Sequence, residues 1–236
     1  MVSAERILLV AAEAREFDGF LAFCKDVRKV RWPVHWARSG SVEDRRFWMV
    51  ANGAGAARAA LAVDAAAPEC HPQAIVSMGF CGALDPALNI GDVFIATKVV
   101  SSVGRTPWSA RVPLDPLGGA GSLASIDHIA QTAAEKAALR ANGASAVEME
   151  AAGVAERAAA LGIPFFCVKS VTDLAGQTFT VDFNKALLSS GHFGTIRILK
   201  SALGNPGKAF PELIRLRNSC RIATRTLGEF IAGCRF

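Results

Sequence analysis

The chain has 236 residues, 51% of them hydrophobic and 20% charged, with a formal net charge of +5. This length and composition predict one globular domain over residues 1–236 with a large core. The start, MVSAERILLVAAEAREF, has only a short apolar run, which argues against a signal peptide or a spanning helix and predicts a cytoplasmic protein. Six cysteines without a C-x-x-C pair, and four histidines remote from them, predict reduced thiols and no metal site.

Apolar runs of strand length alternate with helical stretches along the chain. Branched and aromatic residues predict buried strands in RILLVAA, FWMVANG, AIVSMGF, GDVFIATKVV and PFFCVKSVTD. Helices are predicted over GAARAALAVDAAA, DHIAQTAAEKAALRA and AAGVAERAAALG, the last stopped by Gly162 and Pro164. This alternation predicts an α/β layered domain with a largely parallel or mixed sheet, whose ligands bind beyond the carboxyl ends of the strands.

The basic charge belongs to the C-terminal part of the chain. Residues 197–236 hold eight Lys/Arg against two Asp/Glu, so the remainder is close to neutral. Within residues 205–236 the apolar side chains from Leu213 to Phe230 recur every three or four positions, which predicts a helical extension with Pro211 in its first turn. We expect this helix to dock on the domain with a solvated basic face. Contact with an anionic membrane surface is the alternative; no motif indicates nucleic acid binding.

The stretch NGAGAARAA, residues 52–60, resembles the start of a dinucleotide-binding loop only superficially. Gly53 and Gly55 are present, but Arg58 stands at the third glycine position, and the acidic residue expected about twenty positions later is missing. A tight turn that glycine permits is the preferred interpretation.

Carboxylates follow three predicted strands. Glu13 and Glu16 follow ILLV, Glu148 and Glu150 follow SAV, and Asp173 ends CVKSVTD. Each alone is typical of a helix cap or a surface acid. Together they favour glycosidic chemistry, in which one acid protonates the leaving group and another activates water. Residues two apart diverge by roughly 200° in a helix, so one member of the 148/150 pair is expected to face the ligand.

Three motifs then identify a family resemblance. VEMEAAGVA at 147–155, VKSVTDLAG at 168–176 and MGFCGALDPALNIGDVFIA at 78–96 resemble the purine nucleoside phosphorylase and nucleosidase superfamily, which includes 5'-methylthioadenosine/S-adenosylhomocysteine nucleosidases. The similarity runs from Ile7 to about Leu199. It implies a three-layer α/β/α sandwich around a mixed sheet, a homo-oligomer, with a dimer expected first, and no cofactor.

The resemblance also assigns roles to the acids. It implies that Glu150 accepts hydrogen bonds from the ribose 2' and 3' hydroxyls, which suits a two-oxygen carboxylate, and that Met149 packs beneath the sugar. It places Asp173 at purine N7 as the proton donor, a role that burial would favour. Glu16 matches the general base that activates water, with Glu13 as an offset competitor.

Further pocket residues follow from the same resemblance. Gly79 and Phe80 are expected at the substrate, Ile129 along the base, and Phe183 as an aromatic cover. For Ile129 and Phe183 an ordinary core role is the alternative. Glu148 is expected beside the substrate and also fits the acid at the start of the following helix.

Two departures from the family bear on the reaction. The phosphorylases hold phosphate through an arginine and a hydroxyl residue at the positions occupied here by Ser77 and Phe80, so water is favoured as the nucleophile. Arg15 keeps phosphate open as a co-substrate. A noncatalytic nucleoside-binding protein is the alternative from another class.

The same features bear on the substrate. Phe80 stands where the nucleosidases have a small polar residue, and the segment between Ser101 and Gly121 is shorter than in a typical nucleosidase, so both argue against the usual small 5'-thio substituent. The stretch GALDPALNIGDVFIA and the basic tail PELIRLRNSCRIATRTL instead resemble the hopanoid-associated phosphorylase, which removes adenine from adenosylhopane. We therefore expect a purine nucleoside, with adenine as its base, carrying a bulky 5' group such as that of adenosylhopane, or the 5' group of methylthioadenosine.

Overall fold

The computed structural model describes residues 5–101, 107–114 and 118–236. Part of the segment between Ser101 and Gly121, whose length entered the substrate prediction, therefore lies outside the described residues. The described strands form one sheet in the order β10-β6-β8-β9-β5-β1-β4-β3-β2, with β7 paired to β6. They are β1 (Glu5–Ala11), β2 (Lys25–Lys29), β3 (Trp36–Val42), β4 (Arg45–Ala51), β5 (Ala74–Ala83), β6 (Val93–Ser101), β7 (Trp108–Ser109), β8 (Gly119–Ser125), β9 (Ala146–Glu148) and β10 (Phe165–Asp173).

The sheet is mixed, as predicted, and part of it closes on itself. Strands β4, β1, β5 and β10 run parallel to one another in that order. Strand β10 also pairs antiparallel with β6, which runs parallel to β8, which runs parallel to β9, and β9 returns antiparallel to β5. The pairings therefore form a ring through β5, β10, β6, β8 and β9, with the parallel strands β1 and β4 beside it.

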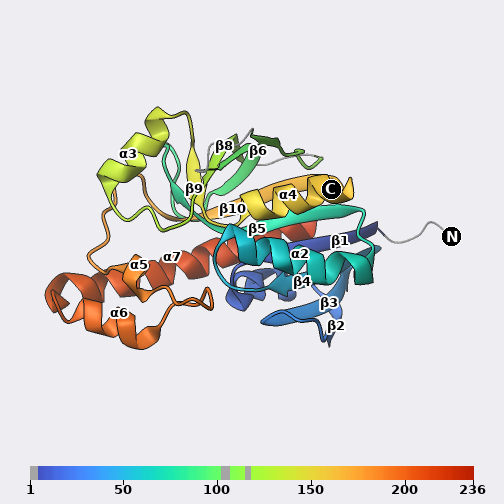
Figure 1. Ribbon diagram of the computed structural model, residues 1–236, viewed down its shortest axis with the longest axis horizontal. Coiled ribbons are helices and arrows are strands. Elements are labelled where there is room, and N and C mark those ends of the chain that lie inside the picture. Colours follow the sequence, from blue (N-terminus) through green and yellow to red (C-terminus); the bar gives the residue numbers. More distant parts are fainter. Residues whose placement is uncertain (1–4, 102–106, 115–117) are drawn as a thin grey trace.

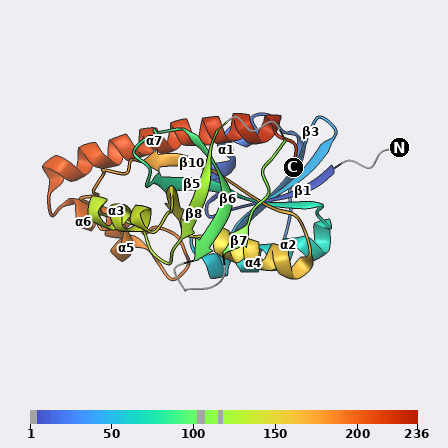
Figure 2. The same ribbon diagram turned by 90° about the horizontal axis from the view of Figure 1, so that it is seen from above.

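Helices cover both faces of the sheet, which gives the three-layer α/β/α arrangement (Figures 1 and 2). Helices α2 and α4 lie on one face, and the long α7 runs along the other beside α1. Helices α3, α5 and α6 gather at one end of the sheet near the N-terminal part of α7 (Figure 1). The bounds are η1 (Ala14–Phe17), α1 (Asp18–Leu21), α2 (Ala56–Cys70), α3 (Ala133–Ala141), α4 (Ala151–Leu161), α5 (Phe183–Ala186), α6 (Thr195–Ala202) and α7 (Pro206–Gly233).

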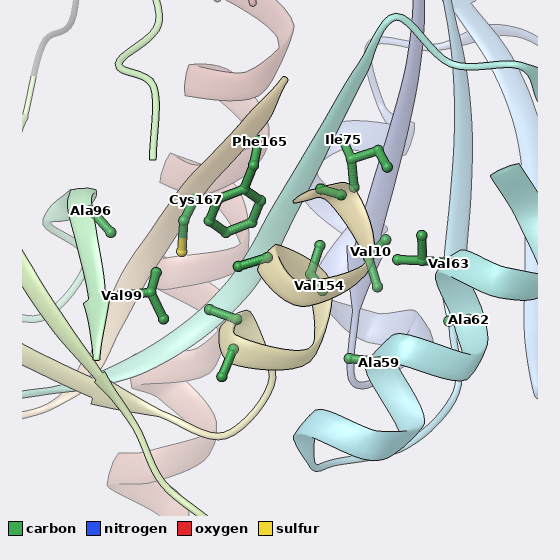
Figure 3. Close-up of a cluster of buried hydrophobic side chains, with 14 of the residues drawn as sticks. Val10, Ala59, Ala62, Val63, Ile75, Ala96, Val99, Val154, Phe165 and Cys167 are labelled. Carbon is green, nitrogen blue, oxygen red and sulfur yellow. The ribbon is translucent and has the colours of Figure 1, made fainter. Parts of the chain in front are cut away.

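The continuous apolar runs in the central strands reflect burial on both faces. In β1, Leu8 and Val10 belong to the core under α2 and α4, while Ile7 and Leu9 belong to the core under α7. Side chains alternate along a strand, so a strand covered on both sides must be apolar throughout. Figure 3 shows the first core, where Val10 of β1 lies near α2 and Val154 points from α4 toward the sheet.

The structure shortens one predicted helix. Helix α3 begins at Ala133, not at Asp127, because the Thr132 hydroxyl accepts a hydrogen bond from the Glu135 N–H at 3.1 Å and caps the helix there. Residues 127–131 are left outside the helix, where they are available to a binding site.

The C-terminal helix is longer than predicted. It begins at Pro206, so Pro211 lies inside it and the expectation that Pro211 occupies its first turn is wrong. Pro206 takes the first helical position, where a missing N–H costs nothing. The predicted apolar stripe faces inward, with Ala223 and Leu227 fully buried. No helix in the described ranges combines the length and apolar character needed to cross a membrane.

Candidate active site

A cavity of about 920 Å³ opens at the carboxyl ends of β1, β5 and β10. It is bounded by η1, the loop before α3, the turn from β9 into α4, and α5, α6 and α7. Ten of the residues named from the sequence line it: Glu13, Arg15, Glu16, Phe80, Ile129, Glu148, Met149, Glu150, Asp173 and Phe183. Gly79 and Ser77 do not line it. Its volume falls within the usual range for small-molecule sites, roughly 300–1,000 Å³.

The acids converge because of the strand order. Strands β1, β5 and β10 are parallel neighbours, so Glu16 and Asp173 follow or end strands that finish at one edge. Strand β9 is antiparallel to β5, yet it has only three residues and pairs with Gly82 and Ala83 at the carboxyl end of β5. Glu148 and Glu150 therefore reach the same edge.

Glu16 lines the cavity from η1 and is buried, with only 6% of its surface exposed. Its Oε2 accepts from the Glu13 N–H at 2.9 Å and its Oε1 from the Phe80 N–H at 3.1 Å. Burial raises the pKa of Glu16, while these two N–H groups and the Lys169 ammonium act in the opposite direction. Glu13 instead pairs at 2.6 Å with Arg15, a largely exposed side chain. Glu16 is thus the acid fixed by the fold.

Gly79 leaves space for the Glu16 carboxylate. Its φ is +131°, and a Cβ at this position would lie 2.8 Å from Glu16 Oε1. Glycine alone meets both the backbone and the space requirement. Its contribution to the site is therefore to make room for the carboxylate, which differs from the substrate contact expected from the sequence.

Glu148 and Lys169 form a buried ion pair. Lys169 Nζ lies 2.8 Å from Glu148 Oε2, and the two side chains are 1% and 2% exposed. Glu148 also accepts from the Glu150 and Ala151 N–H groups at the start of α4. Its oxygens are thus engaged by the protein at the start of α4, as expected of an acid at a helix start.

Glu150 has a different environment. Its Oε1 accepts from the Gly55 N–H at 2.9 Å, and it is 7% exposed. Burial, followed by repulsion from Glu148, raises its pKa to about 8, although Lys169 lowers it. The bond to Gly55 depends on the close approach of α4 to the start of α2, where a Cβ at Gly153 would lie 1.9 Å from a backbone oxygen of α2.

Asp173 ends β10 and lines the same cavity. Its Oδ1 accepts from the Thr172 hydroxyl at 3.0 Å, and its Oδ2 is bound by the ammonium of Lys136. Lys136 also donates to the Leu174 carbonyl at 2.9 Å and is 1% exposed. Burial alone was expected to set the state of Asp173; the structure adds a buried cation that the sequence analysis did not anticipate.

The remaining predicted residues form apolar walls. Met149 and Phe183 are 8% and 7% exposed and line the cavity. The backbone of Ile129 is fixed by Asn184, whose side chain accepts from the Ile129 N–H and donates to its carbonyl at 2.8 and 3.0 Å. Phe179 contacts Phe183 edge to face. Apolar and aromatic side chains of this kind suit contact with an aromatic ring.

The far end of the cavity is built by α6 and α7. Its apolar walls include Ile198, Leu213 and Leu216, which belong to the same apolar cluster as Ile129 and Phe183. The part of α7 that packs against η1 and α1 adds a row of arginines to the lining. These are Arg217, Arg221 and Arg225.

Two functional candidates were missed in the sequence. Lys169 left a signal, because a single lysine in the otherwise apolar run FFCVKSV must be paired if the strand is buried. Lys136 left none, since AAEKAALRA is typical of a helix with a solvated face. Only the packing of α3 against the end of β10 brings it to Asp173.

Comparison with known proteins places this geometry in a family. The model of the phosphorylase superfamily matches residues 6–125 and 119–192. A 5'-methylthioadenosine/S-adenosylhomocysteine nucleosidase of Marinomonas sp. (strain MWYL1) is 26% identical over 227 residues, which cover 84% of this chain and 98% of the relative.

Solved structures agree at the level of the fold. The chain is similar to the Helicobacter pylori 5'-methylthioadenosine/S-adenosylhomocysteine nucleosidase, with a TM-score of 0.74 at 17% identity and coverage of 97% of each chain. Similarity to the H. pylori futalosine hydrolase has a TM-score of 0.72 at 16% identity, over 97% of this chain and 96% of that one. The chain belongs to the phosphorylase superfamily.

Proposed function

We propose that this protein hydrolyses the N-ribosidic bond of a purine nucleoside, with adenine as the leaving base. The observation that carries the proposal is the convergence of Glu16, Glu150 and Asp173 from three separate strand ends onto one cavity. The nucleosidase relative and the hydrolase of the same fold support water as the second reactant.

Glu150 holds the ribose in this proposal. Its Oε1 is oriented by Gly55, and its carboxylate accepts from the vicinal 2' and 3' hydroxyls. Met149, next to it in the wall, packs against the sugar. When it is ionised, as it is above its raised pKa of about 8, Glu150 also stabilises the positive charge that develops on the ribose as the bond breaks.

Glu16 activates the water. Its carboxylate is fixed by two backbone N–H groups and lies in the same electrostatic cluster as Lys169. A fixed base adjacent to the sugar removes a proton from water as it attacks C1'. The Phe80 N–H donates to Glu16, and the apolar ring of Phe80 lines the cavity beside it.

Asp173 acts at the base. Its carboxyl group lines the same cavity as Ile129 and Phe183, whose apolar side chains flank the purine in this proposal. Transfer of a proton to N7 lets the ring take up the electron pair of the broken C1'–N9 bond and leave as a neutral purine. No cofactor takes part in these steps.

The 5' group points toward α6 and α7 in this arrangement. The cavity volume of about 920 Å³ leaves room beyond a nucleoside, and the adjoining walls are apolar. A 5' substituent larger than methylthio is therefore the preferred substrate feature, with adenosylhopane as its extended test case. Arg217, Arg221 and Arg225 of α7 line the same cavity, and the basic face of this helix is compatible with a membrane-surface contact, which is part of the proposal.

Phosphate is the rival nucleophile. Arg15 lines the cavity, but it pairs with Glu13, and Ser77 is fully buried away from the cavity. A phosphate dianion needs several donors directed at it, and neither Arg15 nor Ser77 supplies them. Arg217, Arg221 and Arg225 of α7 also line the cavity, so the comparison with and without phosphate decides between the two nucleophiles. Hydrolysis is preferred on the nucleosidase relative and on the Arg15–Glu13 pair.

The test follows release of free base from adenosine, methylthioadenosine, inosine and an adenosylhopane, each with and without phosphate. We expect adenine release without phosphate, and loss of that release in Asp173→Asn. Formation of ribose 1-phosphate only when phosphate is present would identify a phosphorylase. Tight nucleoside binding with no base released under either condition would identify a noncatalytic binding protein.

A further inference from the structure

Lys136 is a buried cation that the reaction described above does not use. Its side chain is 1% exposed and does not line the cavity. It reaches from α3 to Asp173 Oδ2 and to the Leu174 carbonyl, and its ammonium lies 5.4 Å from the centre of the Phe179 ring. Burying an ammonium is costly, and such a group is retained only where a partner compensates.

The contact matters for the proton that the purine requires. An ammonium bound to a carboxylate stabilises the ionised carboxylate. The Lys136–Asp173 pair at rest therefore consists of an ammonium and a carboxylate, and its one transferable proton resides on nitrogen. A carboxylate without a proton cannot protonate N7 by itself.

We propose that Lys136 supplies the proton that Asp173 passes to the departing purine, so that the acid at the base is the Lys136–Asp173 pair. Lys136 is a positioning residue in this scheme, because it reaches the substrate only through Asp173. The inference rests on the proposed nucleoside hydrolysis and concerns the origin of one proton in it.

The transfer balances in charge and atoms. A proton moves from Lys136 Nζ to Asp173 Oδ2 and from there to purine N7, while the C1'–N9 bond breaks and its electron pair enters the ring. Water adds to C1' and gives a proton to Glu16. The purine leaves neutral, and Lys136 is left as an amine. Return of one proton from Glu16 through solvent to Lys136 restores the resting state.

Arginine and methionine separate this role from a structural one. Lys136→Arg keeps a cation that can pair with Asp173, but a guanidinium does not release its proton in a protein. Lys136→Met removes the cation while keeping an unbranched side chain of similar length. A structural ion pair predicts that arginine substitutes well, whereas a proton source predicts that it does not.

The leaving group supplies a second distinction. Adenine needs a proton to depart, whereas p-nitrophenolate is a stable anion that leaves without one. The rates with adenosine and with p-nitrophenyl β-D-ribofuranoside therefore separate proton delivery from ribose binding and water activation, which both substrates need.

The experiment measures kcat and kcat/KM for both substrates between about pH 5 and pH 10. Lys185→Met is the matched control, because Lys185 forms an exposed pair with Asp182 at 2.9 Å. Thermal unfolding of each variant establishes that it is folded. The Asp173→Asn variant is measured with and without Lys136→Met.

With adenosine we expect Lys136→Arg to lower kcat by roughly 10²- to 10⁴-fold, the usual contribution of a general acid. Turnover of the nitrophenyl riboside stays close to that of the wild type. In Lys136→Met the loss with adenosine also exceeds the loss with the nitrophenyl riboside, because only adenine needs the proton. In the Asp173→Asn background, Lys136→Met adds no further loss.

Wild-type kcat with adenosine in Lys136→Arg, or equal losses with both substrates in either variant, would each overturn the inference. If Lys136→Arg does not fold, the two-substrate comparison in Lys136→Met and the Asp173→Asn pair still decide it. A wild-type protein that releases no base from any nucleoside would instead refute the proposed hydrolysis, so the two failures are distinguishable.

Discussion

Replacement of Lys169 by methionine tests the electrostatic design of the site. Lys169 Nζ lies 2.8 Å from Glu148 Oε2, with both side chains almost fully buried, and its charge also lowers the pKa of Glu16 and Glu150. Lys169→Met leaves buried acids without their cation. Removing one partner of a buried pair costs roughly 3–5 kcal/mol, out of a typical total of about 5–15 kcal/mol.

The expected change is large enough for a simple assay. A chain of 236 residues loses about 2–4 °C in Tm per kcal/mol, so the midpoint should fall by roughly 6–20 °C. Circular dichroism melts at pH 7 measure it, and urea titration gives the free energy of unfolding. Adding Glu148→Gln should recover much of the loss, because the uncompensated charge is then removed as well.

The control for this substitution is Lys185→Met, which breaks a pair whose lysine is 87% exposed. Exposed pairs contribute about 1 kcal/mol at most, so its midpoint should remain near that of the wild type. A Lys169→Met midpoint indistinguishable from that of Lys185→Met would refute the view that Lys169 neutralises a buried acidic cluster.

Three further outcomes follow from the geometry. Burial raises the pKa of Glu150 to about 8, so the free energy of unfolding should fall as pH rises from 4.5 toward 8. Glu150→Gln should flatten this pH dependence in urea titrations, and it should weaken ribose binding, which is measured as a higher KM. Gly79→Ala places a Cβ 2.8 Å from Glu16 Oε1 and should lower kcat by about 10²-fold with a smaller change in Tm; unchanged kcat would contradict the role of Gly79. Gly153→Ala places a Cβ 1.9 Å from a backbone oxygen of α2, so it should lower the free energy of unfolding by about 1–3 kcal/mol and raise KM. Unchanged stability would show that α2 and α4 can separate freely.

The buried strands were predictable because both of their faces are covered. Apolar runs in β1, β5 and β10 admit few other interpretations, and their order predicted a mixed sheet. Strand β2 (Lys25–Lys29) was missed, since KDVRK is exposed throughout at the edge of the sheet and carries no apolar pattern. Strand β8 (Gly119–Ser125) was missed because GAGSLAS is rich in small residues.

The site residues were predictable where acidic side chains follow buried strands. Acids at strand ends identified Glu16, Glu150 and Asp173 as candidates, and the cavity contains all three. The sequence could not show which charged partner each acid has, because those partners come from distant segments of the chain. Glu148 is engaged by Lys169, and Asp173 by Lys136 from a helix that looks solvated in the sequence.

Base release in the absence of phosphate tests the central claim most directly. Wild-type protein and Glu16→Gln are incubated with adenosine in phosphate-free buffer, and adenine and the sugar product are quantified together. We predict adenine and free ribose from the wild type, and a rate roughly 10²- to 10⁴-fold lower in Glu16→Gln. Adenine that appears only after phosphate is added, accompanied by ribose 1-phosphate, or a Glu16→Gln rate equal to that of the wild type, would contradict the account.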